Sequence, residues 1–254
     1  MSRARRVSLA LGSVLLAAAG AVVSTAPNWL FDALAKRYAG CLYRVATTDS
    51  ILALTFDDGP DSLSTPAILR ELRQHQARAT FFLISDRVRN QQPLVRQLLV
   101  EGHEVGNHFT RDRPSIRLSP EEFEEDLLQA HRVLAPFGQL RWARPASGWY
   151  TQSMVSAMSR HDYRCALGSV YPLDAALPSV AWASHYILRN ARPGAIVILH
   201  DGGARGRRTA RVLARVLPKL RQRGYHVVTL SELVAATDVR DPPSRAFGSS
   251  PAPR

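Results

Sequence analysis

Short apolar runs alternate with longer amphipathic segments along most of this chain. The uncharged runs at 51–56, 79–84 and 195–199 are rich in β-branched, aromatic and aliphatic residues and are only five or six residues long, which predicts buried strands. Further strands are predicted at 103–106, 141–144, 163–167 and 225–230. Between them, apolar residues at helical spacing predict helices over 65–75, 93–101, 120–134, 151–160, 182–190 and 207–223.

Strands without charge that alternate with amphipathic helices are typical of a parallel sheet covered on both faces. About seven such units in the chain predict an α/β fold, a distorted or incomplete (β/α) barrel of about seven parallel strands. Two helix starts are marked: Ser119, followed by Pro120 and two acids, and Ser231, which we expect to cap a short final helix.

The N-terminus combines a basic start, MSRARR, with an uncharged stretch from Val7 to Phe31. That stretch is longer than the core of a signal peptide and fits an N-terminal hydrophobic helix that spans a membrane. Residues 24–26 resemble a cleavage site, but Pro27 directly after them is unfavourable, so for residues 1–31 we favour a membrane anchor over a signal peptide. Basic residues before the stretch keep that end cytoplasmic, so the rest is expected to be extracytoplasmic, membrane-anchored or secreted.

The remaining chain divides by composition. We expect a linker helix over 32–47, one catalytic domain over 48–236 and a disordered Pro/Ser-rich tail over 237–254.

The formal net charge is +12, carried almost entirely by arginine. No zinc-knuckle spacing and no aromatic residues clustered among basic ones accompany this charge, so no nucleic-acid partner is predicted. Cys41 and Cys165 match no metal or redox motif; two unpaired thiols are the simpler interpretation, and a disulfide stays open.

Chemically active side chains follow several of the predicted strands. In α/β folds ligands bind at the carboxyl ends of parallel strands, so these side chains are expected at one rim. They are Asp57, Asp58, His108, Asp112, Arg144 and His200.

Three of these residues suggest a metal site. His108 and Asp112 are four residues apart, which on a helical turn places both on one face. Together with Asp58 they provide two carboxylates and one imidazole, a set suited to Zn²⁺ or another borderline divalent ion. Three protein ligands would leave a position for water, as in a catalytic site.

The stretches TFDDGP, GNHFTRD, RPASG and ILHDGG resemble, in this order, the motifs of the polysaccharide deacetylases, carbohydrate esterase family four. The resemblance covers residues 51–234. It implies a metal-dependent hydrolase that removes N-acetyl groups from amino sugars of an envelope or extracellular polysaccharide, such as peptidoglycan, a chitin-like oligomer or exopolysaccharide. The implied cofactor is a divalent metal, zinc or alternatively cobalt, manganese or nickel.

The resemblance also assigns roles. Asp57 would be the general base, oriented by Arg144, and His200 the general acid. Asp58 and His108 would bind the metal, with Asp112 where the family usually has a second histidine. The backbone N–H of Ser147, where the family often has tyrosine, would help to hold the oxyanion. Asp174, in SVYPLDA, is the candidate to tune His200, although the tryptophan of the family's motif is missing.

The departures at Asp112, Ser147 and the missing tryptophan support a second interpretation, a non-catalytic glycan-binding protein on the same fold. Trp149 and Tyr150 either line a sugar-binding groove or pack at the start of the next helix. A phosphotransfer site is disfavoured because it needs a partner lysine, and residues 48–234 contain only Lys219.

Overall fold

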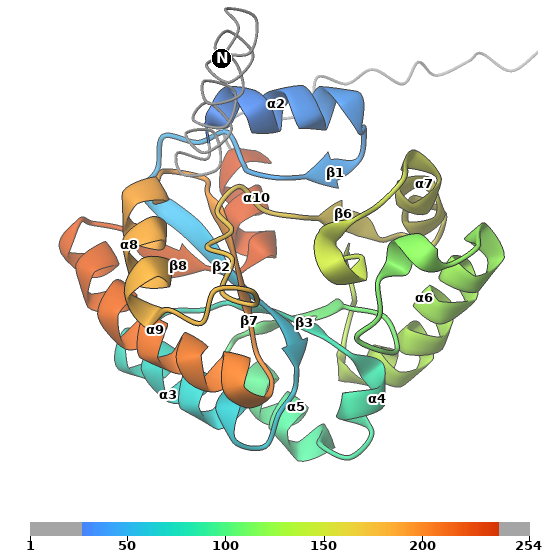
Figure 1. Cartoon of the computed structure of the whole chain (residues 1–254), viewed down its shortest axis with the longest axis horizontal. Coiled ribbons are helices and arrows are strands. Elements are labelled where there is room, and N and C mark those ends of the chain that lie inside the picture. The colour runs from blue at the N-terminus through green and yellow to red at the C-terminus, as the bar shows by residue number, and fades with distance from the viewer. Residues whose placement is uncertain (1–26, 239–254) are drawn as a thin grey trace, which may run out of the picture.

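The computed structural model describes residues 27–238, which form one sheet surrounded by helices (Figure 1). The sheet has eight strands in the order β1-β6-β5-β4-β3-β2-β7, and β8 pairs with β2. Every pairing between named strands is parallel. The strands are β1 Cys41–Leu42, β2 Ile51–Gly59, β3 Thr80–Leu83, β4 Glu104–Asn107, β5 Trp142–Ala143, β6 Arg164–Ala166, β7 Ile196–His200 and β8 His226–Val228.

Helices connect these strands and cover the outside of the sheet (Figure 1). They are α2 Asn28–Arg37, α3 Ser64–Gln74, α4 Ser85–Val88, α5 Gln92–Val100, α6 Pro120–Leu134, α7 Gln152–Arg160, α8 Val180–Asn190, α9 Gly203–Gln222 and α10 Leu230–Asp238. The helices and strands expected from the hydrophobic pattern are confirmed within a few residues, apart from β1 and the short α4, which the pattern did not predict.

The two ends of the sheet approach each other without a continuous ladder. Arg44, just after β1, forms an antiparallel bridge with Ala195, just before β7, and the Val45 N–H donates to the Gly194 carbonyl at 2.9 Å. The sheet is therefore curled into an incomplete barrel, as the sequence pattern predicts.

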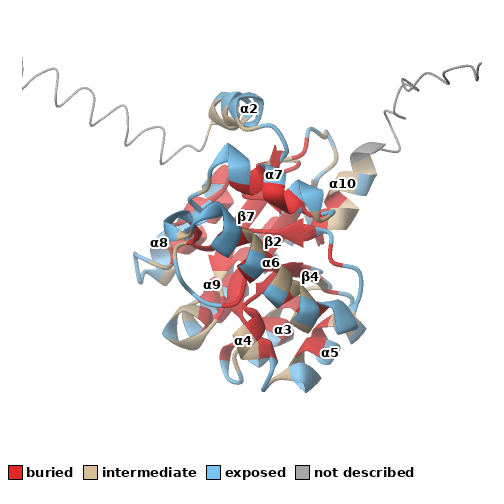
Figure 2. Cartoon of the chain, turned by 90° about the vertical axis from the view of Figure 1, so that its right-hand side faces the viewer, coloured by how far each residue is buried: buried red, intermediate tan, exposed pale blue. Residues whose placement is uncertain are grey.

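Strand β2 shows how the barrel separates its two faces. Leu52, Leu54 and Phe56 are fully buried in the large core between sheet and helices, and Ala53 belongs to a smaller cluster on the other face. Because strand side chains alternate, Asp57 shares the face of Ala53. Figure 2 shows buried residues through the strands and inner helix faces, whereas α2 has no fully buried residue.

The helix starts agree in part with expectation. Ser119 and Glu122 form the capping box at the start of α6. The final helix begins at Leu230, and Thr229 rather than Ser231 caps it, through a 3.2 Å bond from the Glu232 N–H to the Thr229 hydroxyl. The Ser231 hydroxyl instead contacts Glu104 and Trp142 across the sheet, so the predicted cap at Ser231 is wrong.

The segment expected as a linker helix over 32–47 contains the second half of α2 and then β1. Strand β1 joins the sheet beside β6, with Cys41 opposite Cys165. Both thiols are buried and free, and their Sγ atoms lie 2.7 Å apart.

Most of the hydrophobic helix predicted within residues 1–31, and most of the tail over 237–254, lie outside the described residues. Among residues 27–238, the structure contains no helix with the length and apolar character needed to cross a membrane.

Candidate active site

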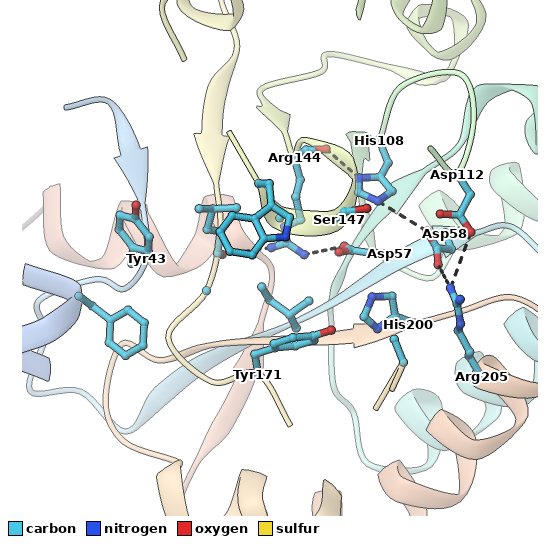
Figure 3. Close-up of a pocket in the computed structure, with 17 residues that line it drawn as sticks. Tyr43, Asp57, Asp58, His108, Asp112, Arg144, Ser147, Tyr171, His200 and Arg205 are labelled. Carbon is cyan, nitrogen blue, oxygen red and sulfur yellow. Dashed lines mark hydrogen bonds and ion pairs between the residues drawn. The ribbon is translucent and has the colours of Figure 1, made fainter. Parts of the chain in front are cut away.

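A cavity of about 500 Å³ opens at the carboxyl ends of β2, β4, β5 and β7 (Figure 3). The structure brings eight of the ten predicted site residues to its lining: Asp57, Asp58, His108, Asp112, Arg144, Ser147, Trp149 and His200. Asp174 contacts one of them from behind, and Tyr150 is outside the lining.

Asp57 and Arg144 form a buried ion pair at the centre of the cavity. Arg144 Nη1 donates to Asp57 Oδ1 at 2.6 Å and to the Thr55 hydroxyl at 2.8 Å. The rest of the guanidinium donates to the carbonyls of Ala166 and Leu167. Burial alone would raise the pKa of Asp57, but the charges of Arg144, His108 and His200 and the hydrogen bond from Arg144 together lower that pKa below its usual value. Asp57 is therefore an anion at neutral pH.

His200 lies directly across from Asp57, because the two are register partners in neighbouring parallel strands. Its Nδ1 contacts Asp174 Oδ1 at 2.9 Å, and its backbone N–H donates to Asp174 Oδ2 at 2.9 Å. Burial lowers the pKa of His200, but the hydrogen bond and charge of Asp174, with Asp57 and Asp58 nearby, raise it to about 9. The imidazole is therefore protonated at neutral pH.

The His108 ring lies between the Arg144 carbonyl and Asp58. Its Nδ1 lies 2.7 Å from the Arg144 carbonyl, which can only accept, so Nδ1 carries the hydrogen. In the neutral ring Nε2 then presents a lone pair, and it lies 3.6 Å from Asp58 Oδ1, which is also an acceptor when ionised. Two ligand atoms about 2.1 Å from a tetrahedral zinc are about 3.4 Å apart. Asp58 and His108 therefore fit two positions around a divalent cation, and a backbone carbonyl that accepts from the other ring nitrogen is a usual partner of a metal-bound histidine.

Asp112 is held differently. Residues 108–112 do not form the helical turn that we expected, and Phe109 has a left-handed φ of 65°. The Asp112 side chain is 44% exposed, and its Oδ2 lies 3.7 Å from Arg205 Nη1 and 4.0 Å from Arg87 Nη2. Arg205 Nη1 also donates to Asp58 Oδ2 at 3.0 Å, so one guanidinium stands between the two carboxylates (Figure 3).

Of the three predicted metal ligands, only Asp58 and His108 are therefore placed to contact one cation. In residues 27–238, no three histidine, cysteine, aspartate or glutamate side chains are grouped as a metal site. Burial raises the pKa of Asp58, which a bound cation would oppose. Asp58 and His108 are the two residues that could hold a metal ion, and Asp112 lies near Arg205 and Arg87.

Two of the three predicted substrate-binding residues, Ser147 and Trp149, line the cavity, and Tyr150 does not. Ser147 lines the cavity in a left-handed conformation with φ 68°, and Asp58 has φ 71°; such backbone conformations in residues other than glycine are concentrated at functional sites. Trp149 lines the cavity with 70% of its surface exposed. Tyr150 packs against Tyr38 with ring centroids 5.1 Å apart, so its contacts favour the packing alternative.

Several lining residues were not predicted from the sequence, chiefly Arg205, Tyr171, Tyr43 and Phe31. The position of Arg205 could have been recognised from the sequence. It lies in the first turn of α9, where a positive charge opposes the helix dipole, so an arginine there indicates acidic neighbours. No sequence pattern indicated that Phe31 and Tyr43 line the cavity, because they come from the segment interpreted as anchor and linker.

The family model and the curated proteins that are similar to this chain all point to the same family. Residues 44–166 match the family model described as polysaccharide deacetylase. A peptidoglycan-N-acetylglucosamine deacetylase of Bacillus cereus is 38% identical over 200 residues, 76% of this chain and 92% of that protein. A chitooligosaccharide deacetylase of Bradyrhizobium is 37% identical over 194 residues, 71% of this chain and 89% of that protein.

Solved structures agree with these relatives. A crystal structure of a peptidoglycan N-acetylglucosamine deacetylase has a TM-score of 0.73 at 25% identity and covers 79% of this chain and 94% of its own. A protein of Bacillus anthracis described as a pseudoenzyme of carbohydrate esterase family four has a TM-score of 0.70 at 26% identity, over 76% of this chain and 68% of its own. With this fold, these ordered motifs and relatives of this similarity, the chain belongs to the polysaccharide deacetylase family.

Proposed function

We propose that this protein is a metal-dependent hydrolase that removes N-acetyl groups from amino sugars of an envelope or extracellular polysaccharide. The observation that supports it most is that Asp57, paired with Arg144, lies opposite His200, which is paired with Asp174. Arg144 keeps Asp57 ionised, and Asp174 keeps His200 protonated, in one cavity. Titratable groups whose surroundings push their pKa values apart are the usual mark of a general base and a general acid.

The proposed reaction uses each group in its resting state. Asp57 accepts a proton from a water molecule that attacks the carbonyl carbon of the N-acetyl group. His200 then donates a proton to the departing amine nitrogen, for which its Nε2 is suited because Asp174 engages Nδ1. Arg144 holds Asp57 in place because its guanidinium also donates to three other acceptors, the Thr55 hydroxyl and the carbonyls of Ala166 and Leu167. The Ser147 backbone N–H is the candidate donor to the oxyanion.

Asp58 and His108 would hold a divalent cation, zinc or alternatively cobalt, manganese or nickel. Such a cation, when bound, would polarise the amide carbonyl and make the attacking water more acidic.

Release of acetate tests the proposal directly. The full chain, supplied with Zn²⁺, is incubated with N-acetylglucosamine oligomers, peptidoglycan and an N-acetylated exopolysaccharide, and free acetate is measured. Asp57→Asn is the matched inactive control because amide and carboxylate have the same shape. We expect acetate release that falls by about 10²–10⁴-fold in Asp57→Asn. No release above this control from any of the three would refute the proposal.

A second function, glycan binding without turnover, is favoured by the position of Arg205. Its guanidinium pairs with both Asp58 and Asp112, where the family pattern has metal ligands. Binding of an N-acetylglucosamine oligomer without acetate release would support this function instead.

The place of action is also part of the proposal. The basic start and uncharged stretch within residues 1–31 support a site outside the cytoplasm, either membrane-anchored or secreted. Fractionation of cells that express the full chain, with protease added to intact cells or spheroplasts, would test this. Recovery of the protein only in the protected soluble cytoplasm would refute it.

A further inference from the structure

The cavity has a second end, which the N-terminal segment builds. Phe31 on α2 and Tyr43 after β1 line the same cavity as Asp57 and His200. Figure 3 shows Tyr43 on the opposite side of the cavity from His200. Both aromatic residues precede residue 44, where the match to the family model begins. This end therefore lies outside the part of the chain that matches the family model.

The two rings are held in place by specific contacts. Their centroids lie 6.2 Å apart with the planes tilted by 39°. Tyr43 is buried and its hydroxyl contacts that of Tyr150. The helix that carries Phe31 is fastened by the next residue, since Asp32 accepts from Arg44 Nε at 2.9 Å and from Nη2 at 3.2 Å. A two-point arginine–carboxylate contact fixes direction as well as distance.

Aromatic residues also continue between the two ends. Trp149 lines the cavity while 70% exposed, and Tyr171 lies beside His200 with ring centroids 6.0 Å apart. Mostly apolar walls with a few polar groups at one end are typical of small-molecule sites. A pyranose ring presents an apolar face of C–H bonds that packs on such aromatic rings.

We propose that Phe31 and Tyr43, with Trp149, form an aromatic subsite that holds the sugar ring next to the one that carries the reacting N-acetyl group. This inference rests on the proposed function, because it takes the ligand to be an N-acetylated glycan. It makes the N-terminal segment a determinant of substrate length, so the protein prefers oligomers over a single sugar.

The test compares two aromatic residues of the same helix. Phe31→Ala removes a ring that lines the cavity, whereas Trp29→Ala removes an exposed ring outside the lining. We expect Phe31→Ala to raise KM for tetra-N-acetylchitotetraose about five- to tenfold with kcat changed less than about twofold. Trp29→Ala should match wild type. Phe31→Leu keeps apolar packing under α2 without a ring face, so it should show most of the same loss while folding normally.

A binding measurement separates this inference from the proposed function. Calorimetry with the same tetramer is performed on Asp57→Asn chains that carry Phe31, Phe31→Leu or Trp29→Ala, so no turnover is needed. Weaker binding only in Phe31→Leu supports the subsite, even if the wild-type protein releases no acetate. Equal affinities in all three chains would overturn the subsite while leaving the deacetylase proposal standing.

A second inference rests on an independent observation, the two thiols. Cys41 and Cys165 are register partners in neighbouring strands, which places their Cα atoms about 4.8 Å apart, within the range of disulfides. Their Sγ atoms lie 2.7 Å apart. We infer that the two thiols form a disulfide when a disulfide oxidant such as oxidised glutathione is present. Each thiol loses one proton and one electron as the Sγ–Sγ bond forms. The disulfide bond of oxidised glutathione breaks, and its two sulfurs take up these two electrons and two protons to become thiols.

Mass spectrometry tests the disulfide. The hydrogen bond with Cys41 and burial raise the pKa of Cys165, which slows its reaction in the folded state. The full chain is therefore refolded in a glutathione buffer. After denaturation and alkylation, we expect no modified cysteine unless a reductant is added first. Cys41→Ser should leave Cys165 open to alkylation. Two alkylated cysteines in the wild-type chain after oxidative refolding would overturn the inference.

Discussion

The protonation of His200 at neutral pH depends on Asp174, and replacing that aspartate with asparagine tests this directly. Asparagine keeps the size of the side chain and an oxygen that can accept from the His200 backbone N–H. It removes the negative charge beside Nδ1. Asp162→Asn is the matched control, because it removes the same charge from an exposed turn before β6 with φ 60°, a conformation that asparagine tolerates.

The size of the effect follows from the pKa of His200, which is raised from 6.5 to about 9. At about 1.4 kcal/mol for each pH unit, the surroundings stabilise the imidazolium by about 3 kcal/mol. Burial opposes this stabilisation, and Asp57 and Asp58 also contribute to it. Removing the charge of Asp174 therefore removes only part of the stabilisation of the imidazolium. We expect the pKa of His200 to fall by at least about one pH unit.

Two measurements check the prediction. The alkaline limb of kcat/KM for acetate release should lie near pH 9 in wild type and move to lower pH in Asp174→Asn. A group with a raised folded-state pKa stabilises the fold fully below its unfolded pKa and loses that contribution as pH rises to the folded pKa. The wild-type advantage in unfolding free energy should therefore be full below about pH 6.5 and disappear by about pH 9. An alkaline limb that stays at the wild-type pH in Asp174→Asn would refute the reasoning.

Three further predictions follow from other contacts. Arg144→Gln leaves Asp57 buried without its cation and should lower the unfolding free energy by about 3–5 kcal/mol in urea titrations; an unchanged midpoint would contradict it. Arg205→Gln removes a positive charge from beside the candidate metal donors and should strengthen Zn²⁺ binding in calorimetry about tenfold, whereas weaker binding would show that Arg205 supports the site. Gly106→Ala places a Cβ 2.7 Å from the Phe82 ring and should cost about 1–3 kcal/mol, seen as a lower Tm; an unchanged Tm would show that the ring moves aside freely.

Local pattern determined much of the architecture. The run from Ile51 to Phe56 had to be buried because it carries no charge, and β2, which pairs with β3, β7 and β8, has fully buried Leu52, Leu54 and Phe56. The capping box at Ser119 was readable because its partners are three residues apart. Elements of this kind depend on neighbours in sequence.

Pattern reasoning was less successful where partners are distant in sequence. Strand β1 has two residues and exists only because β6 supplies its hydrogen bonds. The turn expected after His108 did not form, since the bends there direct Asp112 toward Arg87 and Arg205. No local rule brings an arginine from the start of α9 to the carboxylate of Asp58.

The sequence by itself determined the alternation of strands and helices and the reactive residues at strand ends, because these depend on hydrophobic period and on short motifs. Only the tertiary structure decided which charged groups lie close enough to change one another's pKa. Parallel register set Asp57 opposite His200, a loop brought Asp174 behind it, and the N-terminal segment brought Phe31 and Tyr43 to the same cavity. Protonation and specificity depend on distances of a few ångströms between residues far apart in the chain, and only folding sets those distances.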